Sequence, residues 1–481
     1  MLFNSIQFAL FLPVVYILYW YATAGKVKIQ NILLLIASYY FYACWDYRFL
    51  FLLIFSTFLD YYTGLKMANA VSGGIRKFWF WLSVGINLGF LGTFKYYNFF
   101  ASSFAEAVSG IGFDVHPSSL QVILPVGISF YTFHGLSYVI DIYKGRIPPE
   151  KSFVDYAVFV SFFPLLVAGP IERATHLLPQ IKSERVFNYN KSVDGLRQIL
   201  WGLFKKIVIA DNCAAFANAA FAEPGSSSSA VLTMGAIFFA FQIYGDFSGY
   251  SDIALGTARL FGVELLRNFA FPYFSRDIAE FWRRWHISLS SWFRDYLYIP
   301  LGGSKGGNWS RVRNTFIIFI VSGFWHGANW TFIMWGFLNA LFIMPSILFQ
   351  TNRANLDIVA AGRLFPTFKE AFSVVLTFSL TVFAWIFFRA DSVSDALAYI
   401  SGMLAHPGSF LVLSQFEPYF TIIPILLIFL VVEWLGRENQ FAISRMGLQW
   451  KKPFRYAFYY SIVFAIFWFG GKEQQFIYFQ F

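Results

Sequence analysis

The sequence predicts an all-α protein that crosses a membrane many times. Of its 481 residues, 58% are hydrophobic, 22% are aromatic and only 13% are charged, which lies far from the composition of soluble domains. Apolar runs of spanning or near-spanning length recur along the whole chain. We therefore expect a polytopic bundle of about 11 to 13 membrane segments. Several runs are short and interrupted by Gly, Pro or His, which indicates re-entrant or interfacial helices around a cavity enclosed by protein.

The expected segments follow one another from the first residues to the last. They lie at about 4–21, 30–45, 49–65, 78–94, 120–140, 153–169, 198–213, 230–250, 314–325, 328–349, 371–388, 419–435 and 456–470. The first resembles a signal peptide, because Ala22-Thr23-Ala24 would suit cleavage, but no Lys or Arg precedes its apolar run. We expect a retained helix, and Lys26 and Lys28 place its end in the cytoplasm and the N-terminus outside.

Charge and cysteine content exclude other classes of protein. The net charge of +10 marks cytoplasmic loops, since the chain has no basic soluble face that would bind nucleic acid. Cys44 and Cys213 both lie in apolar runs and form no CxxC pair. The sequence therefore indicates neither a disulfide framework nor a metal site, and no resident cofactor is expected.

A single membrane domain over 1–481 is the simplest organisation, because the longest polar interruption, 171–197, is too short to fold alone. The central block, about 240–340, is the unusual part. Between residues 276 and 313 it carries seven basic residues against three acids, among many aromatics, which is typical of an interfacial amphipathic segment on the cytoplasmic face. The glycine-rich stretch 302–307 follows no strand, so we interpret it as a turn rather than a phosphate-binding loop.

Two histidines stand in this central block. His286 lies in FWRRWHISLSSWFRDYLYIPLGG (281–303) and His326 in SGFWHGANWTFIMWG (322–336). An ionisable side chain at membrane depth indicates a functional site. Burial disfavours the charged imidazolium, so we expect His326 to be neutral and able to act as a general base. No serine–histidine–acid spacing is present, so the simplest use is to activate a substrate hydroxyl for attack on an acyl thioester.

Structural roles for both histidines stay open. His326, expected to lie deeper in the membrane, could bond to neighbouring helices, with Asn329 one turn away as a partner. His286 stands beside Arg283 and Arg284 near the expected cytoplasmic surface, where it could equally be an interfacial side chain.

Asp246 and Asp252 are a second pair of acids in an apolar run. They are six residues apart, on roughly opposite faces of a helix unless the Ser248-Gly249 step breaks it. We interpret them as members of structural ion pairs, with Arg259 as a candidate counter-ion.

The C-terminal segment predicts its own topology. The loop 436–455 carries five basic residues against one acid, so it should be cytoplasmic and the helix 456–470 should run outward. The tail 472–481 is then external, yet it ends in the apolar sequence FIYFQF (476–481). We expect this tail to fold back into the protein or membrane from the outer side. It could bring the Tyr478 hydroxyl toward His326, or it could be an aromatic anchor at the interface.

The two histidine motifs, together with FFPLLVAGPIER (162–173), YGDFSGYSD (244–252) and FIYFQF, resemble the bacterial branch of the membrane-bound O-acyltransferase (MBOAT) family, most closely its alginate O-acetylation members. The resemblance runs over nearly the full chain and is specific for the family but not for the substrate. It implies a multi-helix bundle around a central tunnel, in which His326 is catalytic and His286 is the second family histidine, nearer the cytoplasmic mouth.

The resemblance also implies a function. Family relatives in the inner membrane take an acyl group, here most simply acetyl, from a cytoplasmic thioester, which would be acetyl-coenzyme A or an acyl carrier protein. They deliver it outside for O-acetylation of a cell-surface or exported polysaccharide, with an external esterase-like partner protein. In the similar teichoic acid D-alanylation system, an aromatic tail with a Tyr is proposed to carry the acyl group, which makes Tyr478 the candidate acyl carrier.

Residues and resemblance together predict a mechanism. The donor enters near Arg283, Arg284 and Arg294, whose charges suit an anionic thioester. His326 removes the proton of the acceptor hydroxyl, and Asn329 or Trp325 donates a hydrogen bond to the developing oxyanion, with Asp246 as a supporting residue.

A secondary transporter or flippase is the alternative from another class. In it the histidines would relay protons and Asp246 or Asp252 would bind a coupling ion. The sequence shows no two related halves of the kind that such transporters have. A structural scaffold for polysaccharide export, the third possibility, would leave His326 without a purpose. The acceptor, the choice of donor, the partner and the oligomeric state do not follow from the sequence.

Overall fold

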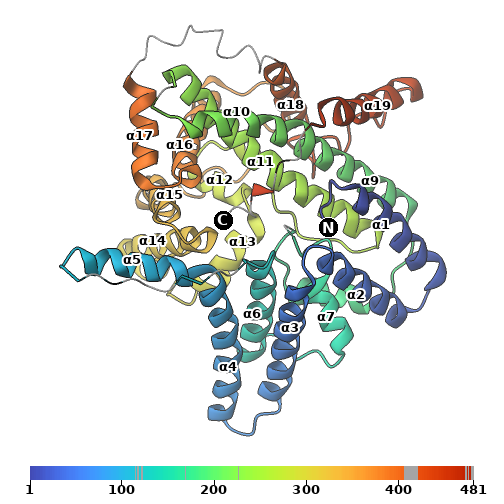
Figure 1. The fold of residues 1–481 in the computed structure, drawn as a ribbon. Coiled ribbons are helices and arrows are strands. Elements are labelled where there is room, and N and C mark those ends of the chain that lie inside the picture. The colour runs from blue at the N-terminus through green and yellow to red at the C-terminus, as the bar shows by residue number, and fades with distance from the viewer. Residues whose placement is uncertain are drawn as a thin grey trace. The chain divides into compact units, whose positions relative to one another are not determined.

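The protein is helical throughout the part that the computed structural model describes, which is residues 1–481 except 114, 116–118, 121–122, 168, 226, 406–420, 472–473, 475 and 478–481. No strand occurs in these residues, so the predicted all-α class is confirmed (Figure 1). The chain divides into two compact units, residues 1–192 with 257–266 and residues 193–256 with 267–481. The single-domain organisation stays a prediction.

The first unit holds the N-terminal helices, among which α3, α4 and α6 pack against one another (Figure 1). Its elements are α1 (Ile6–Ile17), η1 (Leu18–Ala22), α2 (Val27–Ala43), α3 (Tyr47–Ala68), α4 (Gly73–Leu91), η2 (Gly92–Tyr96), α5 (Tyr97–Ser109), α6 (Ile128–Tyr143), α7 (Phe153–Ser161), α8 (Ala174–Lys182) and the start of α9 (Tyr189–Leu203).

The second unit holds the central block and the C-terminal helices. It contains the rest of α9, η3 (Phe204–Ala210), α10 (Asp211–Ala222), most of α11 (Ser229–Leu260), η4 (Pro272–Phe274), α12 (Ile278–Arg284), α13 (Ile287–Phe293), η5 (Arg294–Tyr298), α14 (Gly307–His326), α15 (Trp330–Leu348), α16 (Phe368–Arg389), α17 (Val393–Ala405), α18 (Ile422–Gly436) and α19 (Lys452–Phe469).

Some helices differ from the expected segments. The apolar run 153–169 is helical only as far as Ser161, where α7 ends. Pro164 disfavours helical backbone at the residue before it, and the chain turns there instead. The helices α5 and α17 are amphipathic and lie outside the runs that hydropathy selected. Length and overall hydropathy therefore predict the long helices better than the short ones.

Side-chain caps fix where several helices begin. The Asp277 carboxylate accepts a hydrogen bond from the Glu280 backbone N–H at the start of α12. At the start of α16, the Thr367 hydroxyl and the Glu370 carboxylate each accept from the other's backbone N–H, which is a capping box. These caps satisfy backbone donors that helix starts leave unpaired.

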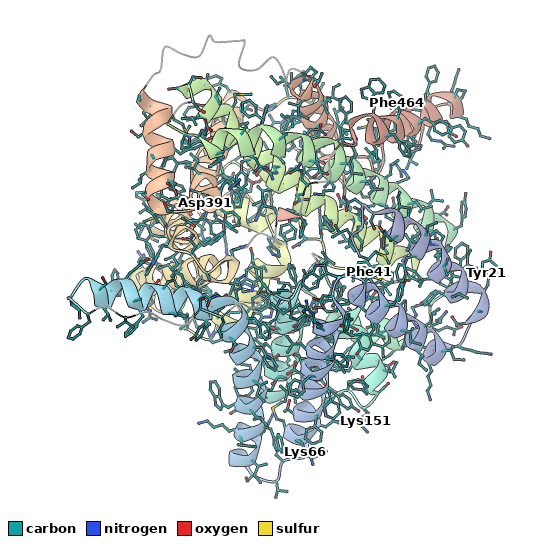
Figure 2. The ribbon with its side chains drawn as sticks, viewed as in Figure 1. Tyr21, Phe41, Lys66, Lys151, Asp391 and Phe464 are labelled. Carbon is teal, nitrogen blue, oxygen red and sulfur yellow. The ribbon has the colours of Figure 1, made fainter. Side chains whose placement is uncertain are left out.

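Four of the described helices, α3, α11, α15 and α16, are long and apolar enough to cross a membrane. Shorter apolar helices occur at Ile6–Ala22, α17 and α18. Large apolar side chains such as Tyr21 and Phe464 are exposed on the outside (Figure 2), which suits contact with lipid. The chain is therefore a multi-pass membrane protein, and the number of its crossings stays a prediction.

The hairpin of α14 and α15 positions one end of the central block. The two helices lie side by side because each presents a glycine to the backbone of the other. A Cβ atom on Gly323 would collide with the Phe332 carbonyl, and one on Gly336 would collide with the Phe319 carbonyl. Small residues permit this close approach of membrane helices.

Replacing Gly336 with alanine should therefore destabilise the protein by about 1–3 kcal/mol, because the added methyl group has to push the two helices apart. The measurement is the thermal unfolding midpoint of the detergent-solubilised protein. Gly85→Ala in α4 is the matched control, since open space surrounds that glycine. Equal midpoints for the two variants would contradict the close approach.

Candidate active site

His326 is the last residue of α14, and the WHGAN sequence explains its position. Gly327 follows as the helix cap, and a Cβ there would meet the Phe332 ring. Asn329 then starts α15, its side chain accepting a hydrogen bond from the Thr331 backbone N–H over 3.1 Å. The imidazole of His326 is thus held at a tight turn between two helices, with only 5% of the residue exposed.

Aromatic rings surround the His326 imidazole. The rings of Trp335 and Phe388 lie 5.1 and 5.4 Å from it, centroid to centroid, both edge-on. Trp385 stacks on Trp335 at 5.5 Å with an interplanar angle of 20°. These aromatic rings pack around the imidazole of His326.

His286 occupies the break between α12 and α13, where its backbone is left-handed with φ of 45°. This conformation is unfavourable for a residue other than glycine and persists only where the surroundings enforce it. Asn268 does so, because its backbone carbonyl accepts from the Ile287 N–H at 3.0 Å. Its side-chain Oδ1 also accepts from the Ser288 hydroxyl at 3.0 Å. His286 itself is 1% exposed, so this part of the expected interfacial segment lies inside the protein.

Asn268 also decides which nitrogen of His286 carries the proton. Its Oδ1 faces the Ser288 backbone N–H, which can only donate, and lies 3.0 Å from Nδ1 of His286. Nδ1 is therefore the donor, and Nε2 holds a free lone pair. Among the residues that the structure describes, Nε2 has no hydrogen-bond partner. His286 is therefore prepared to accept a proton or a hydrogen bond from a bound molecule.

Trp325 brings the two histidines into one site. Its ring centroid lies 6.2 Å from that of His286 and 4.7 Å from that of His326. Two residues 40 positions apart are thus separated by a single indole. The arrangement is suited to general acid–base chemistry in a water-poor environment. The central tunnel that the resemblance implies stays a prediction.

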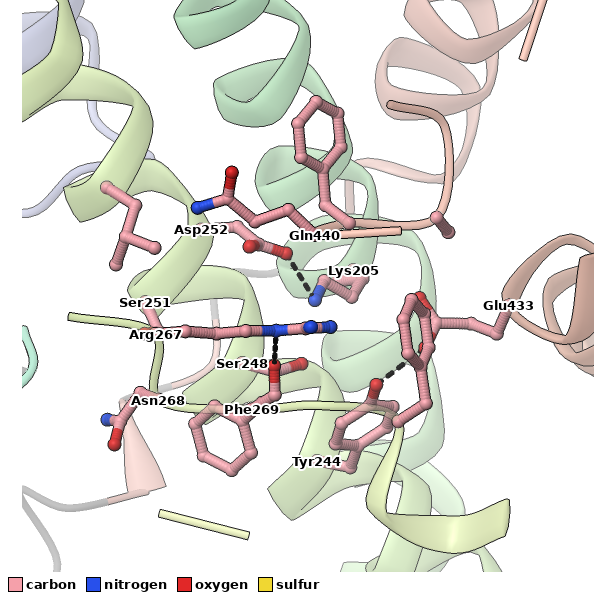
Figure 3. A pocket seen from close by; sticks show the side chains of 14 residues that line it. Lys205, Tyr244, Ser248, Ser251, Asp252, Arg267, Asn268, Phe269, Glu433 and Gln440 are labelled. Atoms are coloured by element: carbon pink, nitrogen blue, oxygen red, sulfur yellow. Dashed lines mark hydrogen bonds and ion pairs between the residues drawn. The ribbon is translucent and has the colours of Figure 1, made fainter. Parts of the chain in front are cut away.

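A small polar pocket, whose interior volume is about 10 Å³, adjoins His286 through Asn268. Its charged lining residues are Lys205, Asp252, Arg267 and Glu433 (Figure 3). Arg267 lies across the pocket, between the Lys205–Asp252 ion pair and Phe269, whose carbonyl accepts from its Nε at 2.5 Å. Arg267 makes no ion pair with any described residue, so it is the cation most available to an anionic guest.

The three arginines expected at the donor entrance have other roles. The guanidinium of Arg283 donates to the backbone carbonyls of Asn352 and Asn355, each at 2.7 Å. Arg284 pairs with the buried Glu280 at 2.8 Å. These two side chains fasten the loop after α15 to α12, and their predicted role in donor binding stays a prediction. Arg294 is exposed and pairs with the adjacent Asp295, which gives it no link to the site either.

Arg276 completes this fastening. It donates to Glu280 and to the Asp357 carboxylate at 2.8 Å. The hydrogen bond from Arg276 lowers the pKa of Asp357 below its usual value. The loop is thus held to α12 by charges that do not face the histidines.

Asn329 is also structural. Its Nδ2 donates to the Asp391 carbonyl at 2.8 Å while its Oδ1 caps α15. One N–H of the amide and its oxygen are used in these structural contacts, and the role of Asn329 as an oxyanion donor stays a prediction. Trp325, the other candidate donor, does contact both histidines, and its role as an oxyanion donor stays a prediction.

The two aspartates of α11 form the ion pairs that the sequence indicates, but not with Arg259. Asp246 lies 2.8 Å from Nζ of Lys206, and Asp252 lies 2.5 Å from Nζ of Lys205. Arg259 pairs with Glu264 in the first unit, so its assignment as counter-ion is wrong. The helix is unbroken at Ser248-Gly249, and the absence of a side chain at Gly249 lets the backbone of Gly202 and Lys206 approach closely.

Several site residues were missed from the sequence. Lys205 and Lys206 stand inside the apolar run 198–213, and charged residues in such a run are themselves a signal of function. Arg267 and Asn268 have no comparable signal, because they lie in an irregular segment whose partners are distant in sequence. Glu433, which accepts from Tyr244 and Trp201, also lies within an apolar helix.

Two described residues of the C-terminal tail lie inside the protein, and the prediction that the tail folds back from the outer side stays a prediction. Phe476 and Ile477 are fully buried. The Phe476 ring lies 4.2 Å from that of Tyr250 and 6.4 Å from that of Phe247, which in turn lies 4.7 Å from His286. Tyr478, the candidate acyl carrier, is outside the described residues.

Comparison with known proteins shows the family of the chain. Residues 148–388 match the model of the MBOAT, membrane-bound O-acyltransferase family. The chain is 40% identical over 411 residues to a probable alginate O-acetylase of Pseudomonas aeruginosa, covering 84% of this chain and 75% of that protein. It is 36% identical over 437 residues to a peptidoglycan O-acetyltransferase of Helicobacter pylori, covering 85% and 80%. A teichoic acid D-alanyltransferase of Streptococcus thermophilus is 29% identical over 281 residues, covering 55% and 68%.

The fold and the comparisons define a polytopic membrane acyltransferase. The chain belongs to the membrane-bound O-acyltransferase family. It is therefore an O-acyltransferase, and the transporter alternative is not supported.

The structural role of Arg284 makes a testable prediction. Arg284→Ala should lower the stability by about 1–3 kcal/mol, because Glu280 loses one of its two cationic partners in a buried place. The exposed Arg294→Ala should change it by less than about 0.5 kcal/mol. Thermal unfolding of the purified variants measures both. A stable Arg284→Ala protein whose KM for the donor rises would instead support the donor-binding role.

Proposed function

We propose that the protein takes an acetyl group from a thioester on the cytoplasmic side and delivers it to the outer side for O-acetylation of a polysaccharide, with His326 as the general base. The main observation behind the proposal is that His326 is buried and that the ring of Trp325 lies next to the rings of both His326 and His286. Relatives named for acetylation of alginate and of peptidoglycan support an acetyl group and a glycan acceptor.

The chemistry needs one proton acceptor and one ester bond. Nε2 or Nδ1 of the neutral His326 takes the proton of the attacking hydroxyl while its oxygen adds to the thioester carbonyl. The C–O bond forms, the C–S bond breaks, and the thiolate takes the proton back from His326 as it leaves. A positioned general base contributes about 10²–10⁴-fold to such a step. His286, fixed by Asn268, offers a second proton acceptor to the same space.

The donor route follows from the polar pocket. Residues Gln440, Phe441 and Ala442 line it, and they belong to the loop expected on the cytoplasmic side. Arg267 there supplies a cation for the phosphate of an anionic thioester, either acetyl-coenzyme A or the phosphopantetheine of an acyl carrier protein. Asn268 joins this pocket to His286. No resident cofactor or metal enters the proposal.

The acceptor route is proposed from the tail. Tyr478 would receive the acetyl group as an ester and present it on the outer side, where a partner acyltransferase would move it to the polysaccharide. Phe476 and Ile477 are buried, and the Phe476 ring lies beside that of Phe247, which contacts His286. This position supports Tyr478, the next residue after Ile477, as the acceptor. We place the protein in the inner membrane with both termini outside.

Replacing His326 with alanine should reduce thiol release from the donor by about 10²–10⁴-fold, since the general base is lost. The assay uses purified protein with acetyl-coenzyme A in one arm and an acetylated carrier protein in the other. His176→Ala is the matched control, because that histidine is half-exposed and bonds to Glu172 in the first unit. If the His326→Ala protein releases thiol at close to the native rate in both arms, His326 is not the base.

A further inference from the structure

A buried cluster of charges holds the backbone of the C-terminal tail. Nζ of Lys206 lies 2.8 Å from Oδ1 of Asp246 and 2.8 Å from Oδ1 of Asp211. The same ammonium donates to the backbone carbonyl of Gln474 at 3.1 Å. Oδ2 of Asp246 accepts from the Ile477 backbone N–H at 2.6 Å. The tail thus gives an acceptor to the lysine and a donor to the aspartate.

These contacts recognise the direction of the tail rather than its side chains. A carbonyl must face the cation and an N–H must face the carboxylate, so a reversed or shifted tail would lose both bonds. Lys206 and Asp246 are almost completely buried. Bonds to charged groups are strong there, because water does not compete for the partners.

The anchored residues stand next to the wall of the active site. Asp246 and Phe247 are neighbours on α11. Asp246 bonds to Ile477, and the ring of Phe247 lies between Phe476 and His286, 6.4 and 4.7 Å from them. The anchor therefore fixes the point from which the last residues of the chain continue.

We propose that Lys206 and Asp246 are positioning residues for acyl transfer, which hold the backbone at Gln474 and at Ile477 so that the acyl acceptor at the end of the chain is presented to the histidine site in one register. The proposal rests on the tail serving as the acceptor in the proposed function. Neither residue touches the reacting atoms, and both act through the tail.

Hydrogen exchange of the full-length protein, read by mass spectrometry on the C-terminal peptide, tests the anchor without any need for activity. In Asp246→Asn the Ile477 N–H meets a neutral acceptor in place of a charged one and Lys206 loses an ion-pair partner, so the tail amides should exchange roughly tenfold faster or more. Asp252→Asn is the matched control, since it weakens the other buried lysine pair of the same helix and makes no bond to the tail. Its tail exchange should match that of the native protein.

The kinetic readout separates positioning from general stability. Ile477→Pro removes the N–H that Asp246 accepts and also the buried Ile477 side chain, so Ile477→Ala, which loses the side chain but keeps the N–H, is the matched control. With acetyl-coenzyme A or acetylated carrier protein as donor, Ile477→Pro should lower kcat for acetylation of the C-terminal peptide at least tenfold relative to Ile477→Ala, with KM for the donor unchanged.

Two results would overturn the inference. Equal tail exchange in Asp246→Asn and Asp252→Asn would show that the cluster does not anchor the tail. Fast exchange with native kcat would show that the anchor does not serve transfer. Failure of the proposed function appears differently, as native activity in His326→Ala, and leaves the exchange result unaffected.

Discussion

A buried imidazole needs hydrogen-bond partners for its two ring nitrogens, because water cannot reach them. In the centre of this protein, Asn268 provides one such partner for His286. Buried polar groups are almost always hydrogen-bonded, and leaving one unpaired costs about 1–3 kcal/mol. Asn268 satisfies one nitrogen of His286 and fixes its left-handed backbone, while the other nitrogen is left without a described partner. We propose that the acyl donor or acceptor supplies the partner of this nitrogen.

The helix α11 contributes one aspartate to the proposed donor pocket and another to the contact with the C-terminal tail. Asp252 lines the polar pocket and Asp246 holds the tail, six residues and therefore about 9 Å apart along the helix. Each aspartate has its own buried lysine. Buried ion pairs add little net stability, yet removal of one partner costs about 3–5 kcal/mol. We infer that these ion pairs position other groups. The Lys205–Asp252 pair lines the pocket through which we propose that the donor arrives, and the Lys206–Asp246 pair holds the tail that would receive the acyl group.

Composition and motifs predicted the helical membrane class, the family and the two histidines, because these depend on hydropathy and on long, chemically unusual sequences. The burial of Phe476 and Ile477 agrees with the expectation that an apolar end has no reason to stay in water, while the position of the rest of the tail stays a prediction. The sequence did not predict which groups the polar side chains contact. Arg283, Arg284 and Asn329 are polar residues beside the histidines in sequence, but their side chains point to the backbone of loops far along the chain. Arg267 and Asn268 reach the site only through tertiary packing, which no local pattern encodes.

The central claim is that a thioester and two imidazoles meet in one buried space. It is tested most directly by an experimental structure of the protein with an acetyl-coenzyme A analogue in which a methylene group replaces the thioester sulfur. The account predicts density for the analogue running past Arg267 and Asn268, with its acetyl carbonyl beside the rings of His286 and His326. An analogue bound with its acetyl group far from both rings would contradict it.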